Sequence, residues 1–397
     1  MNYLYLNILI NAFVLLKLVL CEHYVVMPYI APTYFMEINA QFDDDNVLLP
    51  LNLLNDFTWI SKTSVFNINK AQIVNDNQNI TIGIRQHSVQ TYKTSFGVSV
   101  NRTKHTKPFV DGFHIYIADS PSFRIYQLGV SFAHEFVDPN FSIVDLLYKQ
   151  NVINERSFSI VTDNVNKNGS VYIGTIPSDI TNTKLYKGTC EAFNNTIKWK
   201  CKLNKIQIGT AILNLSSNEQ MNVEFQTSIS RILIPQKIVD FFHHALSPFI
   251  LNKQCEVNDI THSGQWILDC NKDIIPTLPN FILTIDNFTY SIPFSGLFEQ
   301  QSGNSYTSFF KSPYEPKETD NNTITLGYTF LSLFDIINFN YEHNTIQLYS
   351  KTIPITSTTH THSSLLTQPL LYILTALITV GIIIDIVVKL KPNINYN

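Results

Sequence analysis

The sequence predicts a mainly β protein with few helices. Short runs of alternating or continuous apolar residues recur along the 397-residue chain, and clusters of Gly, Asn and Asp separate them at hairpin-like intervals. Aromatic residues make up 12% of the chain, with 27 Phe and 19 Tyr, and aromatic side chains favour strands over helices. A chain of this length can bury a sizeable core and is long enough to form two lobes.

The order of the expected elements follows from the apolar pattern. Strands are expected at residues 47–51, 80–84, 96–100, 113–117, 170–173, 206–213, 281–285 and 345–349. Only residues 143–150 and 235–246 give clear helical signals, and the second segment starts with Pro235, which suits a first helical turn. The boundary between the two halves of the chain is expected within residues 177–187.

Apolar segments near both ends predict targeting and anchoring. Residues 4–20 are mostly apolar, which predicts a secretory signal peptide at residues 1–21 with cleavage before Glu22; an uncleaved anchor is the alternative. Residues 370–388 are almost entirely apolar and, at roughly 1.5 Å per residue, would span about 28 Å as a transmembrane helix. A buried core helix is the alternative. Residues 353–369 are expected to form a Ser/Thr-rich stalk, and the lysines after residue 388 predict a cytoplasmic tail at 389–397.

Charge and cysteine content narrow the class of protein. The net charge is −4 and charged residues make up 15% of the chain, so no broad basic surface suggests nucleic-acid binding. If Cys21 leaves with the signal, Cys190, Cys201, Cys255 and Cys270 remain, and these allow three pairings. We favour Cys190–Cys201 and Cys255–Cys270, which close short loops. The sequence has no Cys-x-x-Cys spacing of the kind that binds zinc, and we expect no metal or cofactor.

Acceptor triplets for N-glycosylation are spread along the chain. They lie at Asn79, Asn101, Asn140, Asn168, Asn194, Asn214, Asn287 and Asn321. Together with the apolar ends, they predict a single-pass glycoprotein of the secretory pathway or cell surface. Its body would be lumenal or extracellular, and its one C-terminal span would make the membrane a partner.

Two segments carry the strongest functional signal. Residues 34–38 lead through residues 47–51 to Asn52-Leu53-Leu54 and then Trp59, and Val223-Glu224-Phe225 leads to Gln226-Thr227-Ser228. In layout these segments resemble the two active-site segments of the pepsin-like aspartic protease family, which places Asp-Thr-Gly after an apolar strand. Further matches follow in the family's order at residues 125–130, 158–160, 168–174, 199–209, 270–293 and 325–330.

The resemblance implies a bilobal, pepsin-like double β-barrel with a deep inter-lobe cleft. Its lobes would cover residues 22–180 and 181–352. The two catalytic aspartates of the family fall on Asn52 and Gln226. In the first turn Leu53 and Leu54 replace Thr and Gly, and in the second turn Thr227 is kept while Ser228 replaces Gly. The flap tyrosine of the family falls at Ile84.

These replacements affect the chemistry directly. The family's mechanism needs two carboxylates that share one proton, so that one activates water while the other polarises the scissile carbonyl. Carboxamides at positions 52 and 226 cannot take a proton from water. The sequence therefore predicts an inactive protein that binds a peptide, protein or glycan, and the candidate binding residues are Asn52, Leu53, Leu54, Trp59, Ile84, Gln226, Thr227 and Ser228. The alternatives are an active membrane-bound aspartic endopeptidase with an atypical dyad and a structural surface antigen with a vestigial cleft.

Other clusters of polar residues are interpreted as ordinary surface. Three consecutive aspartates at residues 43–45 are expected to form a solvated hairpin turn, and Asp56 is expected to point away from the site. His243 and His244 are expected on the surface of a helix. His360 and His362 are expected in a solvated stalk.

Overall fold

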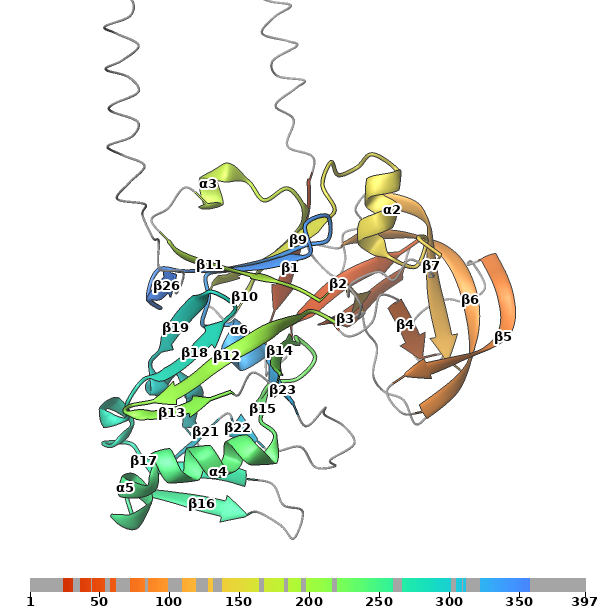
Figure 1. Ribbon diagram of the computed structural model, residues 1–397. Helices are drawn as coiled ribbons and strands as arrows, with labels where there is room; N and C mark the ends of the chain where they lie inside the picture. The colour runs from red at the N-terminus through yellow and green to blue at the C-terminus, as the bar shows by residue number, and fades with distance from the viewer. Residues whose placement is uncertain are drawn as a thin grey trace, which may run out of the picture. The chain divides into compact units, whose positions relative to one another are not determined.

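The computed structural model describes most of residues 24–357 (Figure 1). The described ranges are 24–30, 36–43, 45–53, 58–61, 72–82, 85–98, 109–118, 128–130, 138–163, 168–181, 185–193, 198–215, 220–259, 266–300, 305–308, 310–311 and 322–357. The chain separates into two compact units, residues 1–356 and residues 357–397, and only the first residue of the second unit is described.

Three sheets dominate the described part, as the mainly β prediction requires. The largest has thirteen strands in the order β11-β25-β24-β9-β10-β1-β2-β6-β7-β4, with β3 and β5 paired to its members and β8 paired to β3. Its strands are β1 (Tyr24–Ile30), β2 (Glu37–Phe42), β3 (Asp45–Asn52), β4 (Thr58–Ser61), β5 (Gln72–Ile82), β6 (Arg85–Val98), β7 (Val110–Ala118), β8 (Leu128–Gly129), β9 (Ser157–Asp163), β10 (Asn168–Gly174), β11 (Tyr186–Glu191), β24 (Ile336–Asn340) and β25 (Thr345–Ser350).

The second and third sheets come from the later part of the chain. The nine-stranded sheet has the order β22-β15-β23-β14-β12-β18-β19-β26, with β13 paired to β12. Its strands are β12 (Lys200–Ile208), β13 (Ala211–Asn214), β14 (Met221–Phe225), β15 (Ile232–Leu233), β18 (Phe281–Ile285), β19 (Phe288–Ile292), β22 (Phe310–Lys311), β23 (Thr323–Leu326) and β26 (Ile355–Ser357). The four-stranded sheet contains β16 (Cys255–Asp259), β17 (Trp266–Asn271), β21 (Ser305–Ser308) and β20 (Phe298–Gln300).

The expected double β-barrel needs correction, because no sheet of the described residues closes on itself. The largest sheet instead runs from the hairpins of the first half through β1, β10 and β9 into β24 and β25, which come from the end of the body. Strands of both halves of the chain therefore share one open sheet. The expected boundary at residues 177–187 lies after β10 and extends into the first two residues of β11.

Helices are few and short in the part of the chain that the structure describes. Both expected helices are present: α2 (Ile143–Lys149) begins after Ser142, whose hydroxyl caps it, and α4 (Gln236–Ala245) begins after Pro235. The other helical segments are α3 (Ser178–Thr181), α5 (Ser247–Leu251), α6 (Tyr328–Leu331) and the 3₁₀ turns η2 (Ile275–Thr277) and η3 (Phe294–Leu297). Within the described residues no helix has the length and apolar character needed to cross a bilayer. Residues 1–21 and 370–388 lie outside those residues.

One expected strand is divided in two. Residues 206–213 form the end of β12 and the start of β13, which pair with each other across a two-residue turn. Gly209 has a φ of +56° in this turn, a left-handed conformation that glycine adopts without a steric penalty. The apolar pattern continues across the turn, so the reversal is not visible from hydrophobicity alone.

Aromatic side chains fill the core around the strands. Phe158, Trp199 and Phe339 pack together, with the Phe158 and Phe339 rings stacked at 4.6 Å. A second group surrounds Phe242, whose ring centroid lies 4.6 Å from that of Phe310. Burial of such large side chains stabilises the fold by about 25 cal/mol per Å² of apolar surface. The high aromatic content of the sequence thus serves packing.

Candidate functional site

Asn52 ends strand β3 in a buried position. Asn52 is 5% exposed, and the next residue, Leu53, is completely buried. β3 pairs in parallel with the short strand β8, where Asn52 lies opposite Gly129. The Asn52 carbonyl accepts a hydrogen bond of 2.9 Å from the Val130 amide, and the Thr58 hydroxyl accepts one of 3.3 Å from the Gly129 amide. The end of β3 is therefore fixed by backbone pairing on one side.

Gln226 occupies the corresponding position after strand β14. Gln226 is 7% exposed, and its backbone N–H donates a 3.0 Å hydrogen bond to the backbone carbonyl of Leu326. β14 pairs in parallel with β23, in which Leu326 is the last residue. Each of the two positions thus ends a strand that pairs in parallel with a Leu-Gly segment, Leu128-Gly129 in one case and Leu326-Gly327 in the other. This shared local geometry supports the equivalence of the two segments.

The two turns are in direct contact. The Thr227 hydroxyl donates a 2.6 Å hydrogen bond to the carbonyl of Leu51, which precedes Asn52. Both the donor and the acceptor are buried. Leu53 holds the position in the first turn that Thr227 holds in the second, and its apolar side chain cannot make the reciprocal bond. The hydroxyl of Thr227 is used inside the protein and is not available to a ligand.

Glu224 places a buried carboxylate beside Gln226. Its side chain is 4% exposed, and Lys198 and Lys200 approach its Oε2 atom at 3.3 and 3.4 Å. The Gln226 side-chain nitrogen donates to Glu224 Oε1. Lys200 lies directly opposite Glu224 on the neighbouring strand β12, and Lys198 precedes that strand. Two ammonium groups and one amide therefore surround this carboxylate.

The contact with Glu224 fixes the orientation of the Gln226 amide. An ionised carboxylate only accepts hydrogen bonds, so the group that faces it must be the NH₂ of Gln226. The Gln226 carbonyl oxygen consequently points away from Glu224. The side-chain oxygen of Gln226 is a neutral hydrogen-bond acceptor, and the negative charge of Glu224 forms ion pairs with Lys198 and Lys200. Among the described residues that contact Gln226, Glu224 supplies a carboxylate, whereas the family's mechanism needs two carboxylates that share a proton.

Gly327 allows the second turn to pack against the segment that follows β23. A Cβ atom at this position would lie 2.2 Å from the Arg231 carbonyl oxygen and 2.7 Å from that of Ile229. The close approach permits hydrogen bonds from the Tyr328 amide to Ile229 and from the Thr329 amide to Ser230, at 2.7 and 3.1 Å. Tyr328 is buried, and burial raises the pKa of its phenol.

The other predicted site residues are distributed more widely. Trp59 is buried with Val89 and Ala118 in a small cluster separate from the main core, and Ser228 is half-buried. Leu54 and Ile84 lie outside the described residues, although the β5–β6 hairpin that leads to Ile84 is present, with Ile82 opposite Arg85.

The polar clusters that we interpreted as ordinary surface are partly described. Asp43 lies in the β2–β3 turn with a φ of +49° and accepts hydrogen bonds of 2.9 Å from the amide and hydroxyl of Ser95. His243 and His244 are exposed on α4. Asp56, His360 and His362 lie outside the described residues.

Sequence reasoning missed the lysine–glutamate group. The signal was available: Lys198 and Lys200 alternate around Trp199, and Glu224 stands between the apolar residues Val223 and Phe225, two residues before Gln226. Alternation of this kind predicts side chains on one face of a strand. Which strand would pair with β14 was not evident, so the partners of Glu224 could not be assigned.

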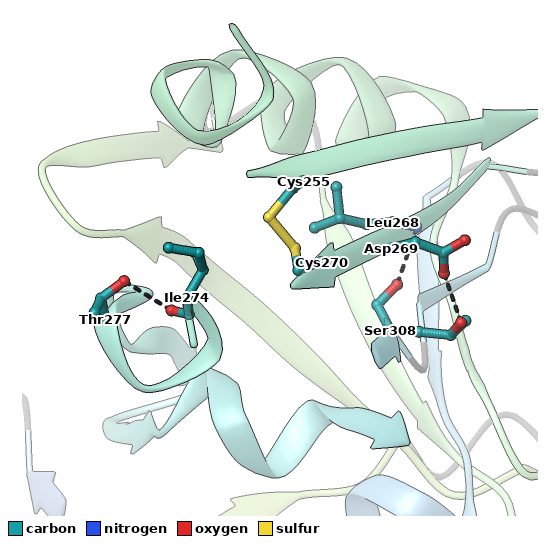
Figure 2. Close-up of a disulfide and its surroundings, with 8 residues drawn as sticks. Cys255, Leu268, Asp269, Cys270, Ile274, Thr277 and Ser308 are labelled. Atoms are coloured by element: carbon teal, nitrogen blue, oxygen red, sulfur yellow. Dashed lines mark hydrogen bonds between the residues drawn. A yellow bond between two sulfur atoms is a disulfide. The ribbon is translucent and has the colours of Figure 1, made fainter. Parts of the chain in front are cut away.

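Both favoured disulfides are present. Cys190–Cys201 links β11 to β12, and Cys255–Cys270 joins directly opposite residues of β16 and β17. Figure 2 shows the second disulfide beside Leu268 and Ser308, where the Leu268 amide donates to the Ser308 hydroxyl at 3.2 Å. Asp286 lies near the sulfurs of the first disulfide, but both thiols are consumed by the bond and cannot bind a metal.

Four glycosylation acceptors can be ranked by exposure. Asn79 on β5 and Asn287 in the β18–β19 turn are exposed, whereas Asn140 and Asn168 are half-buried. Asn214 is the last residue of β13. Asn101, Asn194 and Asn321 lie outside the described residues.

Comparisons with known proteins agree with this geometry. A family model described as eukaryotic aspartyl protease matches residues 126–351, more than half of the chain. Pepsin F of Oryctolagus cuniculus is 24% identical over 230 residues, which are 56% of this chain and 53% of that protein, so the match spans about half of its length.

Solved structures show the same fold. An aspartic proteinase from Irpex lacteus has a TM-score of 0.64 at 14% identity, with 85% of this chain and 99% of that chain covered. Basic 7S globulin from soybean has a TM-score of 0.63 at 14% identity, with coverage of 86% and 97%. At such identities the likeness concerns the fold alone.

Proposed function

Because the chain belongs to the eukaryotic aspartyl protease family, we propose that it is a member without peptidase activity that retains the fold to bind a ligand. The observation that carries the proposal is the pair of carboxamides at the ends of two equivalent strands, Asn52 on β3 and Gln226 after β14. Neither amide can act as a general base on water near neutral pH. The ligand class is a peptide, protein or glycan.

The surroundings of Gln226 support the loss of activity. A rescue of catalysis by Glu224 would require this carboxylate to leave Lys198, Lys200 and the Gln226 amide, all of which hold it in its buried place. A single carboxylate would also lack the second acid that polarises the substrate carbonyl. Among the described residues that contact Gln226, the rival function, an active membrane-bound aspartic endopeptidase with an atypical dyad, would depend on Glu224.

The amide oxygens suggest what the site prefers to bind. The Gln226 carbonyl oxygen is turned away from Glu224, so it can accept a hydrogen bond from an N–H or O–H group of a ligand. Backbone amides of an extended peptide and hydroxyl groups of a glycan both supply such donors. We therefore propose that the binding surface lies on the side of Gln226 opposite Glu224, with Asn52 and Ser228 as further candidates; Trp59 is buried in its own cluster and cannot contact a ligand there.

We further propose that the protein is a single-pass glycoprotein of the secretory route. A cleaved signal at residues 1–21, lobes at 22–180 and 181–352, a stalk within 353–369 that starts only after β26 (Ile355–Ser357) and a membrane helix at 370–388 would make the body lumenal or extracellular. The two disulfides of the body support this arrangement, because such bonds persist in oxidising compartments.

Activity assays separate the two candidate functions. Full-length protein purified in detergent should cleave no denatured substrate between about pH 3 and 6, while an active pepsin under the same conditions should cleave it. The double variant Asn52→Asp, Gln226→Asp should also remain inactive, because the turns lack the family's glycines and the carboxylate introduced at position 226 would face Glu224. Cleavage by the unaltered protein that a statine-type inhibitor blocks would refute the proposal.

Binding is tested with defined probes. Full-length protein is applied to an array of peptides from unfolded proteins and to a glycan array, next to the variant Gln226→Leu, which keeps a similar volume but loses the acceptor. A specific signal that falls at least about tenfold in the variant supports binding through this site. Equal signals from both proteins, or none on either array, would contradict it and favour a structural role.

A further inference from the structure

A polar hollow lies between the β6–β7 hairpin and helix α2, away from the strand ends that carry Asn52 and Gln226. α2 lies beside β7 (Figure 1). The hollow has a volume of about 340 Å³, within the range of roughly 300–1,000 Å³ typical of small-molecule sites. Its polar lining is contributed by Lys93, Asp111, His114, Asn140, Lys149 and Gln150.

The walls of the hollow are held together by hydrogen bonds. The Gln150 side-chain nitrogen donates to the Asp111 carbonyl at 2.7 Å, which ties the end of α2 to β7. His114 Nδ1 lies 3.2 Å from Asp138, and Leu146 supplies a buried apolar surface. Lysine ammonium groups, a carboxylate and an apolar patch together suit a ligand whose hydroxyl groups both donate and accept hydrogen bonds.

A glycosylation acceptor forms part of this lining. Asn140 starts the triplet Asn140-Phe141-Ser142, and its backbone is fixed on both sides. The Asn140 amide donates to an Asp138 carboxylate oxygen at 3.0 Å, and the Asn140 carbonyl accepts from the His114 amide at 2.8 Å. The Asn140 side chain is therefore presented to the hollow from a rigid backbone.

The other two residues of the triplet, Phe141 and Ser142, have structural roles. Ser142 is buried, and its hydroxyl accepts a 3.2 Å hydrogen bond from the Asp145 amide, which caps α2. Phe141 is also buried and packs at 4.5 Å against the Tyr116 ring. An enzyme that must reach the serine of the triplet cannot do so in the folded protein. A sugar on Asn140 would have to be added before α2 forms.

We propose that Asn140 carries an N-linked glycan whose first sugar occupies this hollow. The inference rests on the secretory route proposed above. Covalent attachment at the lining itself gives the sugar a high effective concentration, so weak hydrogen bonds to Lys93, Lys149 and Asp111 suffice to hold it in place. The glycan would cover the space between β7 and α2 and act as part of the structure.

Accessibility to an amidase that removes N-glycans tests the proposal. The full-length chain is produced in a secreting eukaryotic cell, and the amidase is applied in heavy-oxygen water to native and to denatured protein. Mass spectrometry then identifies each released site. Asn287 is the matched control, because it lies exposed in the tight β18–β19 turn. We expect both sites to be occupied, with native release at Asn140 at least about tenfold slower than at Asn287 and equal release after denaturation.

Two variants separate shielding by the hollow from other causes. Lys149→Ala and Asp111→Ala remove polar groups from the walls at exposed positions, so they should speed native release at Asn140 without changing its occupancy. An unmodified Asn140 in a protein glycosylated at Asn287 would overturn this inference alone, as would equal native release rates. Absence of glycan from both sites would overturn it together with the proposed secretory route.

Discussion

Glu224→Gln tests whether the carboxylate beside Gln226 is a buried, lysine-neutralised group. The substitution keeps the size of the side chain and removes its charge. Glu224 is 4% exposed and Lys200 is 13% exposed, so both charges are largely removed from water, whereas Lys198 is 39% exposed and can turn toward solvent. The variant leaves the Lys200 ammonium buried without its counterion.

The magnitude follows from the geometry. Two unit charges about 4 Å apart attract by about 4 kcal/mol at an effective dielectric constant of 20, and the loss of one partner of a buried pair costs about 3–5 kcal/mol. The contribution of Lys198 is discounted because its exposure allows screening by water. We therefore expect the free energy of unfolding to fall by about 3 kcal/mol.

Urea unfolding followed by tryptophan fluorescence measures the effect as a change in midpoint at constant m-value. Lys351→Gln is the control, because Lys351 is 59% exposed and pairs with Asp335 at 3.6 Å on the surface, where a pair contributes at most about 1 kcal/mol. Adding Lys200→Met to Glu224→Gln should recover part of the loss, because the stranded charge is removed. A cost for Glu224→Gln no larger than that of the control would refute the buried ion pair.

Four further predictions concern the same turns and the β6–β7 region. Thr227→Val should cost about 1–3 kcal/mol because a buried carbonyl loses its donor, and Thr227→Ser should restore most of this loss in thermal unfolding. Gly327→Ala should lower stability by about 2–3 kcal/mol, because its Cβ would overlap backbone oxygens; a melting temperature equal to that of the unaltered protein would contradict this close approach. Gln226→Glu places a second carboxylate against Glu224 and should destabilise the protein at neutral pH, with partial recovery in acid as one of the pair takes a proton; the unfolding midpoint as a function of pH checks this. Burial lowers the pKa of His114 below its ordinary value of 6.5 despite the opposing effect of Asp138, so below pH 6.5 the unfolded chain binds more protons than the folded protein. The free energy of unfolding should therefore decrease as the pH falls through 6.5, and His114→Gln should make this decrease smaller in urea unfolding measured at several pH values.

The sequence was sufficient to identify local elements wherever one periodicity dominated. Residues 113–117 and 281–285 lie within β7 and β18; apolar residues alternate with His114 and Tyr116 in the first segment and form a nearly continuous run in the second, and both patterns are typical of strands. The start of α2 follows from Ser142, whose hydroxyl satisfies a backbone amide of the first turn. These elements depend on neighbours in sequence, which is why they could be assigned without the tertiary structure.

Pairings between distant segments could not be predicted in the same way. β8 has two residues and is defined only by its parallel pairing with β3, and β4 exists through its pairing with β7. Neither segment is long enough to give a periodic signal. The course of the largest sheet from the first half of the chain into β24 likewise depends on the packing of β9, and the expectation of closed barrels failed at this level.

The candidate site shows the same division between local and tertiary information. Positions 52 and 226 were found from segments that resemble a family pattern, because the order of residues along the chain carries that information. The lysine partners of Glu224 come from the start of β12 and the residues just before it, and they reach Glu224 only because β12 pairs with β14 in the folded sheet. The sequence therefore predicted that Asn52 and Gln226 stand at the positions of the family's aspartates, whereas the charge that lies beside Gln226 required the fold.

Glu224 also gives a physical reason for glutamine rather than aspartate at position 226. A second carboxylate there would be repelled by Glu224, whereas the glutamine amide donates a hydrogen bond to it. The two lysines then neutralise the remaining charge. An aspartate at position 226 would require a shift in proton affinity in this arrangement, whereas the carboxamide is compatible with the buried ion pair. The same coupling explains why restoring aspartate at positions 52 and 226 would not by itself recreate a shared proton.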